Sequence, residues 1–182
     1  MLAKLIAFAG DCQIFGTITL AAGARLSDVL NGESALVVAD ADLVSHADGH
    51  VVHLAEIVLE RDDLFAIEAV GPRGLEQRRV HTVRHRLEVS LGPYTVLGQL
   101  HTFPGGRPLV AVSQRAPMIP LTNATIAFSD HRGVQIRDVE TLIVNRELAR
   151  WVRPEEADLS VFNAISGNVR NVASPLVGGS LP

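Results

Sequence analysis

Three histidines and two aspartates stand close together in and just before the stretch SHADGHVVH. His46, His50 and His53 follow Asp42, and Asp48 lies among them. Imidazole nitrogens and carboxylate oxygens are ligands for zinc and other transition metals, so metal binding is one chemistry that this segment offers. However, His50 and His53 are three residues apart in an expected strand, so they point to opposite faces. The pattern therefore favours a polar turn at a strand tip, and we predict no metal site and no cofactor.

Other reactive side chains lack the neighbours that catalysis requires. Asp40 and Asp42 share one face of an expected strand, as acid–base pairs and cation sites do, but the spacing also suits a structural or solvated role. Ser27 and Asp28 have no nucleophile elbow around them, and helix capping explains them more simply. Cys12 follows a turn without a histidine at a known spacing. No phosphate-binding or dinucleotide-binding glycine motif occurs. We predict no catalytic residues and no enzyme activity.

One basic cluster occurs, between Arg73 and Arg86, with five arginines and two histidines. Such a run can bind RNA, an anionic lipid head group or an acidic partner. The aromatic residues that stack on bases are not interleaved with it, and the whole chain carries a net charge of −4 with a pI of about 5.9. The sequence argues against DNA binding, disfavours RNA or lipid binding, and indicates a solvated linker.

The pattern of elements around these residues occurs twice in the sequence. When the chain is displaced by 82 residues, glycines, one arginine and alternating apolar residues coincide without a gap. After small insertions, Val37–Val44 matches Pro120–Ala127, and Glu56–Asp62 matches Thr141–Glu147. We therefore predict a tandem duplication. The retained pairs in the ungapped block are Gly10 with Gly92, Gly16 with Gly98, Gly23 with Gly105, and Arg25 with Arg107.

Each repeat predicts the same order of elements: two strands joined by a tight turn, a short helix, then longer closing strands. Gly16 and Gly98 lie inside a strand, which predicts a bulge or bend of the kind that closes a small barrel. The fold class is therefore mostly β, with two tandem small β-barrel or β-roll repeats, one short helix in each, and an irregular C-terminal tail. The expected ranges are 1–70 for repeat 1, 71–82 for a linker, 83–153 for repeat 2 and 154–182 for the tail.

The segment Arg25-Leu26-Ser27-Asp28-Val29-Leu30-Asn31, followed by DADLV and VLERDDL, resembles an uncharacterised bacterial β-domain family of RLSDxLN type. The second repeat lacks the Ser-Asp and Asn letters. A more distant analogy is to Sm-like and SH3-like small barrels. The resemblance implies a β domain and a bacterial source, and it implies no activity.

Arg25 and Arg107 are the polar residues that the ungapped block retains. One interpretation is structural, with each guanidinium bound to backbone carbonyls or a carboxylate, and Arg61 and Arg146 doing likewise. The other is a ligand site, in which Arg25 and Arg107 hold a small anionic molecule.

Composition limits the remaining choices. Hydrophobic residues make up 47% and aromatic residues 4% of the chain, so the core is expected to be aliphatic. A single cysteine permits no internal disulfide and favours a reducing compartment, which we take as the bacterial cytoplasm. The apolar N-terminus reads as a strand, and no run is long enough to span a membrane. We therefore expect a non-catalytic scaffold or protein-interaction module whose partner is another protein or a second copy of itself. The alternative is a regulatory module that binds an anionic ligand.

Overall fold

The computed structural model of the protein describes residues 1–70 and 81–155. The predicted mostly-β fold is confirmed. The first part of the chain forms β1 (Leu2–Phe8), β2 (Cys12–Thr19), α1 (Leu26–Gly32), β3 (Ala35–Ser45), β4 (Val51–Glu60), η1 (Arg61–Asp63) and β5 (Ala66–Val70). The second part forms β6 (Val83–Leu91), β7 (Tyr94–Thr102), α2 (Pro108–Gln114), β8 (Met118–Asp130), β9 (Gly133–Asn145), η3 (Arg146–Leu148) and β10 (Trp151–Pro154).

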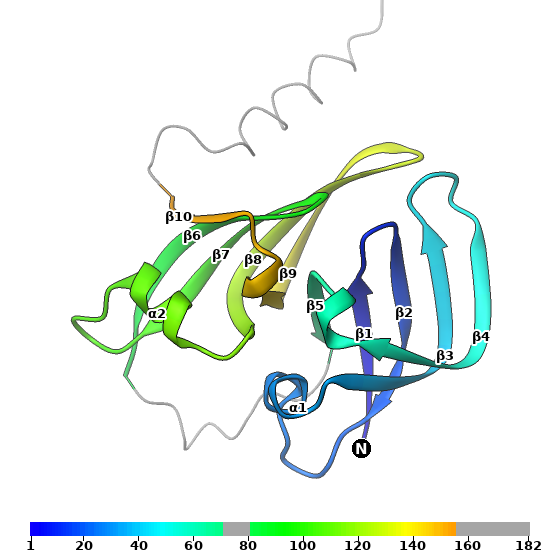
Figure 1. Cartoon of the computed structure of the whole chain (residues 1–182), viewed down its shortest axis with the longest axis horizontal. Helices are drawn as coiled ribbons and strands as arrows, with labels where there is room; N and C mark the ends of the chain where they lie inside the picture. Colours follow the sequence, from blue (N-terminus) through cyan, green and yellow to red (C-terminus); the bar gives the residue numbers. More distant parts are fainter. Residues whose placement is uncertain (71–80, 156–182) are drawn as a thin grey trace, which may run out of the picture.

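The ten strands form one open antiparallel sheet in the order β10-β6-β7-β8-β9-β5-β1-β2-β3-β4 (Figure 1). The prediction of two small barrels is not confirmed, since this sheet does not close. The reason lies in β5, which pairs with β1 on one side and with β9 on the other. The strand that would have to close the first half as a barrel is thus shared with the second half.

Interior glycines bend the sheet, as predicted. The β2–β3 ladder shifts register at Gly16 and the β7–β8 ladder shifts at Gly98. A Cβ atom at Gly16 would lie 2.4 Å from Val38 Cγ1, and one at Gly98 would lie 2.8 Å from Leu121 Cβ. Both distances are shorter than van der Waals contact, so glycine lets the neighbouring strand approach at the bulge.

The two halves repeat the same strand pairing. Leu5 pairs with Gly16 between β1 and β2, and Leu87 pairs with Gly98 between β6 and β7. The facing strand of each bulge also matches: Asp40 in β3, opposite Gly16, has a φ of 47°, and Asn123 in β8, opposite Gly98, has a φ of 46°. Aspartate and asparagine tolerate this left-handed geometry better than most residues. The halves therefore share register and local geometry, while their origin by duplication stays a prediction.

Two large hydrophobic core clusters hold the sheet, and each takes residues from both halves. The cluster under the first half includes Met118 and Ile143 from β8 and β9. The cluster under the second half includes Phe8 and Ala66 from β1 and β5. Because the cores interpenetrate, the β5·β9 junction is an internal part of the fold.

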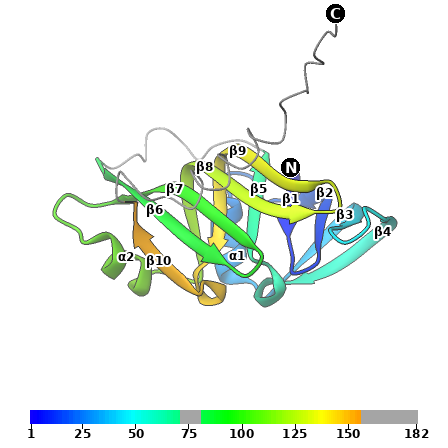
Figure 2. The ribbon, with the colours of Figure 1, turned by 90° about the horizontal axis from the view of Figure 1, so that it is seen from above.

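Aromatic side chains join the long hairpins. The His46 Nε2 atom lies 2.7 Å from the Tyr94 hydroxyl oxygen, and the His46 ring centroid lies 5.2 Å from that of Phe128. A Cβ atom at Gly49, in the β3–β4 turn, would clash with the His131 ring in the β8–β9 turn. Figure 2 shows the β8–β9 hairpin reaching toward the β3–β4 hairpin.

The predicted linker and tail can be compared with the bounds of the strands. β5 ends at Val70 and β6 begins at Val83, so the expected linker separates them in sequence. Most of that linker, at 71–80, and nearly all of the predicted tail, from 156 onward, lie outside the described residues.

Candidate functional site

Strand β4 ends the sheet and exposes apolar side chains. In the described part of the chain its only strand partner is β3. Val51, Val52 and Val58 are exposed, and Val58 retains 57% of its accessible surface. Edge strands of stable monomers usually carry charges, prolines or short lengths that prevent further pairing. β4 carries two exposed glutamates, Glu56 and Glu60, but its ten residues and three exposed valines still offer a surface suited to another strand.

Strand β9 is the counterpart of β4 in the second half, and its outer edge is covered. Val37 pairs with Val58 in the first half, and its counterpart Pro120 pairs with Ile143 in the second, so Val58 and Ile143 occupy matching positions. Ile143 is only 3% exposed, because β5 covers this edge. One position is thus buried in one half and open in the other.

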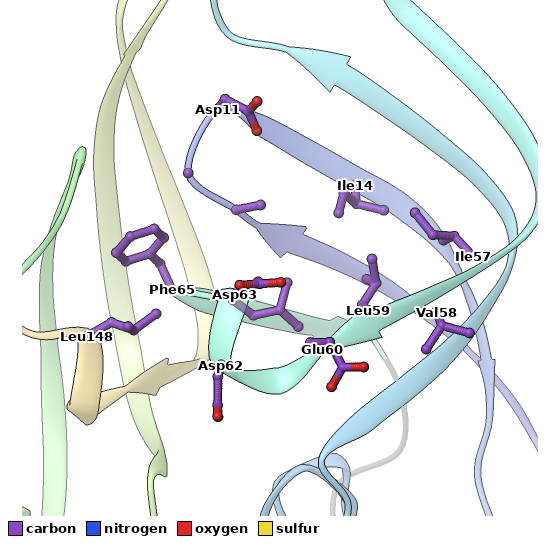
Figure 3. A pocket seen from close by; sticks show the side chains of 13 residues that line it. Asp11, Ile14, Ile57, Val58, Leu59, Glu60, Asp62, Asp63, Phe65 and Leu148 are labelled. Atoms are coloured by element: carbon purple, nitrogen blue, oxygen red, sulfur yellow. The ribbon is translucent and has the colours of Figure 1, made fainter.

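A pocket of about 630 Å³ opens beside β4 (Figure 3). Its apolar lining includes Ile14 from β2, Leu59 from β4 and Phe65 from the segment before β5. Carboxylate residues also line it, from the β1–β2 turn, the end of β4 and η1. These are Asp11, Glu60, Asp62 and Asp63.

The pocket combines an apolar interior with negative charge. Glu60, Asp62 and Asp63 are exposed, and Asp62 forms an ion pair with Arg61 at 3.0 Å. Such a combination favours an aromatic or aliphatic group next to a cation, because apolar burial and charge attraction act together.

Strand β10, at the opposite end of the sheet, carries an aromatic side chain next to cations. Trp151 keeps 39% of its surface exposed, and the Arg153 guanidinium carbon lies 5.0 Å from the centroid of its ring. Arg150, just before the strand, is also exposed. An aromatic side chain and two arginines therefore mark this edge.

A buried carboxylate anchors β10. Glu88 of β6 is 1% exposed, and Arg153 donates to its Oε2 atom from Nε at 2.9 Å and from Nη2 at 2.7 Å. A carboxylate in this environment needs a cation and hydrogen bonds to offset its desolvation. The pair therefore fixes the position of β10 along β6.

The two sequence-predicted arginines stand at matching places. Arg25 is the N-cap residue of α1 and Arg107 that of α2, and both are exposed. α1 packs on β8, whereas α2 packs on β7 and β10. The structure thus positions them on separate helices, and a shared anion site stays a prediction. Of the second pair, Arg146 does bind a backbone carbonyl, with Nε 2.8 Å from the oxygen of Arg115.

The histidines have separate partners. His46 contacts Tyr94, and the Nδ1 atom of His53 lies 2.8 Å from Asp42 Oδ1. The backbone amide of His50 donates to Asp48 within the turn. Over residues 1–70 and 81–155, no three metal-ligating side chains gather in a group.

Cys12 is partly buried beside Asp11. Burial and the neighbouring carboxylate raise the pKa of the thiol to about 11. The thiol is therefore protonated at neutral pH, where the thiolate would be the nucleophile.

The basic segment is only partly visible. Of its residues, those at 73–80 lie outside the described part. Arg86 lies in β6 and forms an ion pair with Glu155.

Comparisons of the chain with protein-family models, with curated proteins and with solved structures found no match. Among the described helices, none is long and apolar enough to cross a membrane.

Sequence reasoning missed the two sheet edges. Trp151 marked the end of periodic sequence, and Val58 was one apolar residue in a long strand. Their roles depend on strand order, which no local pattern contains. Val58 and Ile143 occupy matched positions and are both apolar, but only Ile143 is covered by another strand. This difference becomes visible once the strand order is known.

Proposed function

We propose that this protein is a non-catalytic assembly module that binds protein partners at the open edges of its sheet. The observation that carries the proposal is the apolar β4 edge, with Val58 exposed at a position that β5 covers in the other half. A partner strand added there gains main-chain hydrogen bonds and buries the valines. The single cysteine is compatible with a reducing compartment, and we place the protein in the bacterial cytoplasm.

The pocket supports the same proposal. It lies directly beside the edge, so a strand that pairs with β4 is able to place a side chain inside it. Interfaces draw much of their affinity from a few aromatic or arginine side chains that fill such pockets.

Site-specific photo-cross-linking in cells tests this function. A photoreactive amino acid replaces Val58, and a matched one replaces Phe103, which is 68% exposed in the loop before α2. We expect discrete protein adducts from position 58 and few from position 103. Equal labelling at both positions, or no adduct at 58, contradicts an interaction surface at β4.

A further inference from the structure

We propose that the strand added to β4 is β10 of a second copy of this chain, so that copies join head to tail into one continuous sheet. This inference rests on the proposed function and names its partner. The template is inside the molecule, where β5 of one half pairs with β9 of the other. β4 corresponds to β9, and β10 corresponds to β5. The two outer strands of the sheet therefore correspond to the two strands that pair inside the molecule.

The correspondence of β10 with β5 follows from their common neighbours. In the first half β5 pairs Ala66 with Phe8 and Glu68 with Ile6. In the second half β10 pairs Trp151 with Ser90 and Arg153 with Glu88, at the matching places on β6. The residues of β10 therefore occupy the positions of β5 residues: Trp151 corresponds to Ala66, Val152 to Ile67 and Arg153 to Glu68.

The internal junction predicts the register between copies. There Ala66 pairs with Val144, Ile67 with Ile143, and Glu68 with Leu142. On β4 the matching residues are Leu59, Val58 and Ile57. We therefore expect Trp151 of one copy opposite Leu59 of the next, Val152 opposite Val58, and Arg153 opposite Ile57.

This register brings Trp151 to the pocket. Directly opposed residues of an antiparallel pair project from the same face, and Leu59 lines the pocket together with Ile14 and Phe65. The matched residue in the internal junction is Ala66, which is fully buried in the second core. A tryptophan is far larger than an alanine, and the pocket beside β4 offers an apolar space of about 630 Å³ for it.

Charge favours the same orientation. In the internal junction the amide of Asn145 donates to the carbonyl of Phe65 at 2.8 Å. The matching residues are Glu60 at the end of β4 and Arg150 before β10, so a carboxylate and a guanidinium meet between copies. In a symmetric antiparallel contact of two β4 edges centred on Val58, Glu60 of each copy would lie opposite Glu56 of the other, and like charges oppose that arrangement.

Pro154 is compatible with this pairing. It corresponds to Ala69, which lies beyond the three residue pairs between β5 and β9. Its missing N–H therefore limits the ladder to a short stretch without removing one of those pairs. A head-to-tail contact uses different surfaces on the two copies, so it produces either a closed ring or an open filament.

Sedimentation velocity of the full chain over a range of concentrations tests the inference. We expect wild type to form species larger than a dimer. Val58→Lys blocks β4 and Trp151→Asp blocks β10, and each should weaken association by about tenfold or more, because a charged side chain replaces an exposed apolar residue at the interface. Phe103→Lys is the control and should associate like wild type. Circular dichroism confirms that each variant is folded.

Mixing the two blocked variants separates head-to-tail from symmetric pairing. Val58→Lys retains a working β10, and Trp151→Asp retains a working β4. The mixture should form a one-to-one dimer and stop there. Self-association of either variant at wild-type strength, or a mixture that stays monomeric, overturns the inference.

A disulfide tests the register and is independent of the blocked variants. In a Cys12→Ser background, Val58→Cys with Val152→Cys should give a ladder of covalent multimers on oxidation, since opposed residues lie close enough to bridge. Val52→Cys with Val152→Cys should give little. Equal yields from both pairs contradict the register. A wild-type chain that stays monomeric, together with position-58 adducts of a different protein, overturns this inference while leaving the proposed function intact.

Discussion

Gly98 shows how the absence of one Cβ atom affects the path of a neighbouring strand. The residue lies at the β7 bulge, where a Cβ atom would approach Leu121 Cβ to 2.8 Å. The close approach of β8 at this bulge therefore depends on a residue without a side chain.

Gly98→Ala is expected to destabilise the protein by about 1–3 kcal/mol, because the added methyl forces the neighbouring strand to shift. Urea unfolding followed by circular dichroism measures this change. Gly32→Ala is the control, since nothing lies within 4 Å of its Cβ and alanine is favourable at a helix end. Equal effects from both substitutions contradict the steric explanation.

His46 is a second residue whose surroundings determine its chemistry. Burial lowers the pKa of its imidazole, although Asp130 and Asp11 oppose the shift. Its ring contacts Tyr94 and Phe128, so the neutral form fits this aromatic group best.

Acid should therefore weaken the contact between the hairpins. Because the folded pKa lies below 6.5, the unfolded state binds more protons as the pH falls, so stability is complete above about 6.5 and declines below it. An NMR titration of the His46 ring should give a pKa below 6.5, the ordinary value of a histidine side chain. In thermal melts His46→Phe should lose less stability in acid than wild type does. A ring that titrates at or above 6.5 contradicts this expectation.

At the scale of elements, β10 is a short strand attached by a specific ion pair. The strand has four residues, and Glu88 beneath it is 1% exposed. Removing the cation leaves a buried carboxylate without its main partner, which is costly.

Arg153→Ala should lower the free energy of unfolding by about 2 kcal/mol, below the range for a fully buried pair because the arginine is partly exposed. His53→Ala, on β4, removes a contact with Asp42 in which the two side chains are 67% and 51% exposed, and it should cost less than about 1 kcal/mol. Chemical denaturation of both variants measures the difference. An equal or larger loss from His53→Ala would show that Glu88 does not depend on Arg153.

At the scale of the whole molecule, the two halves behave as one body. Besides the shared cores, the side chain of Asn31 in α1 bonds to both the amide and the carbonyl of Met118 in β8, each at 2.9 Å. The helix of the first half is thus fixed to a strand of the second.

Unfolding should consequently be a single transition. Trp151 is the one tryptophan of the chain and reports on the second half by fluorescence, while far-UV circular dichroism reports on all strands. The two urea curves should coincide. Separate midpoints would show that the halves unfold independently and that the interpenetrating cores contribute little coupling.

The sequence by itself determined the local elements. Alternating apolar residues and turn pairs specify the strands, Pro108 fits the first turn of α2, and Gly16 and Gly98 mark the bulges, because each depends on neighbours within a few residues. It also located arginines at matched positions, and Arg25 and Arg107 stand at the N-caps of the two helices.

Only the tertiary structure decided which strand covers which edge. Closed barrels and an open sheet need the same alternation and the same turns, and they differ in long-range pairing alone. The choice of β9 as the second partner of β5 buried Ile143 and left Val58, its counterpart, exposed. The candidate interaction surface arises from that choice, since an edge is a property of strand order and not of any one strand.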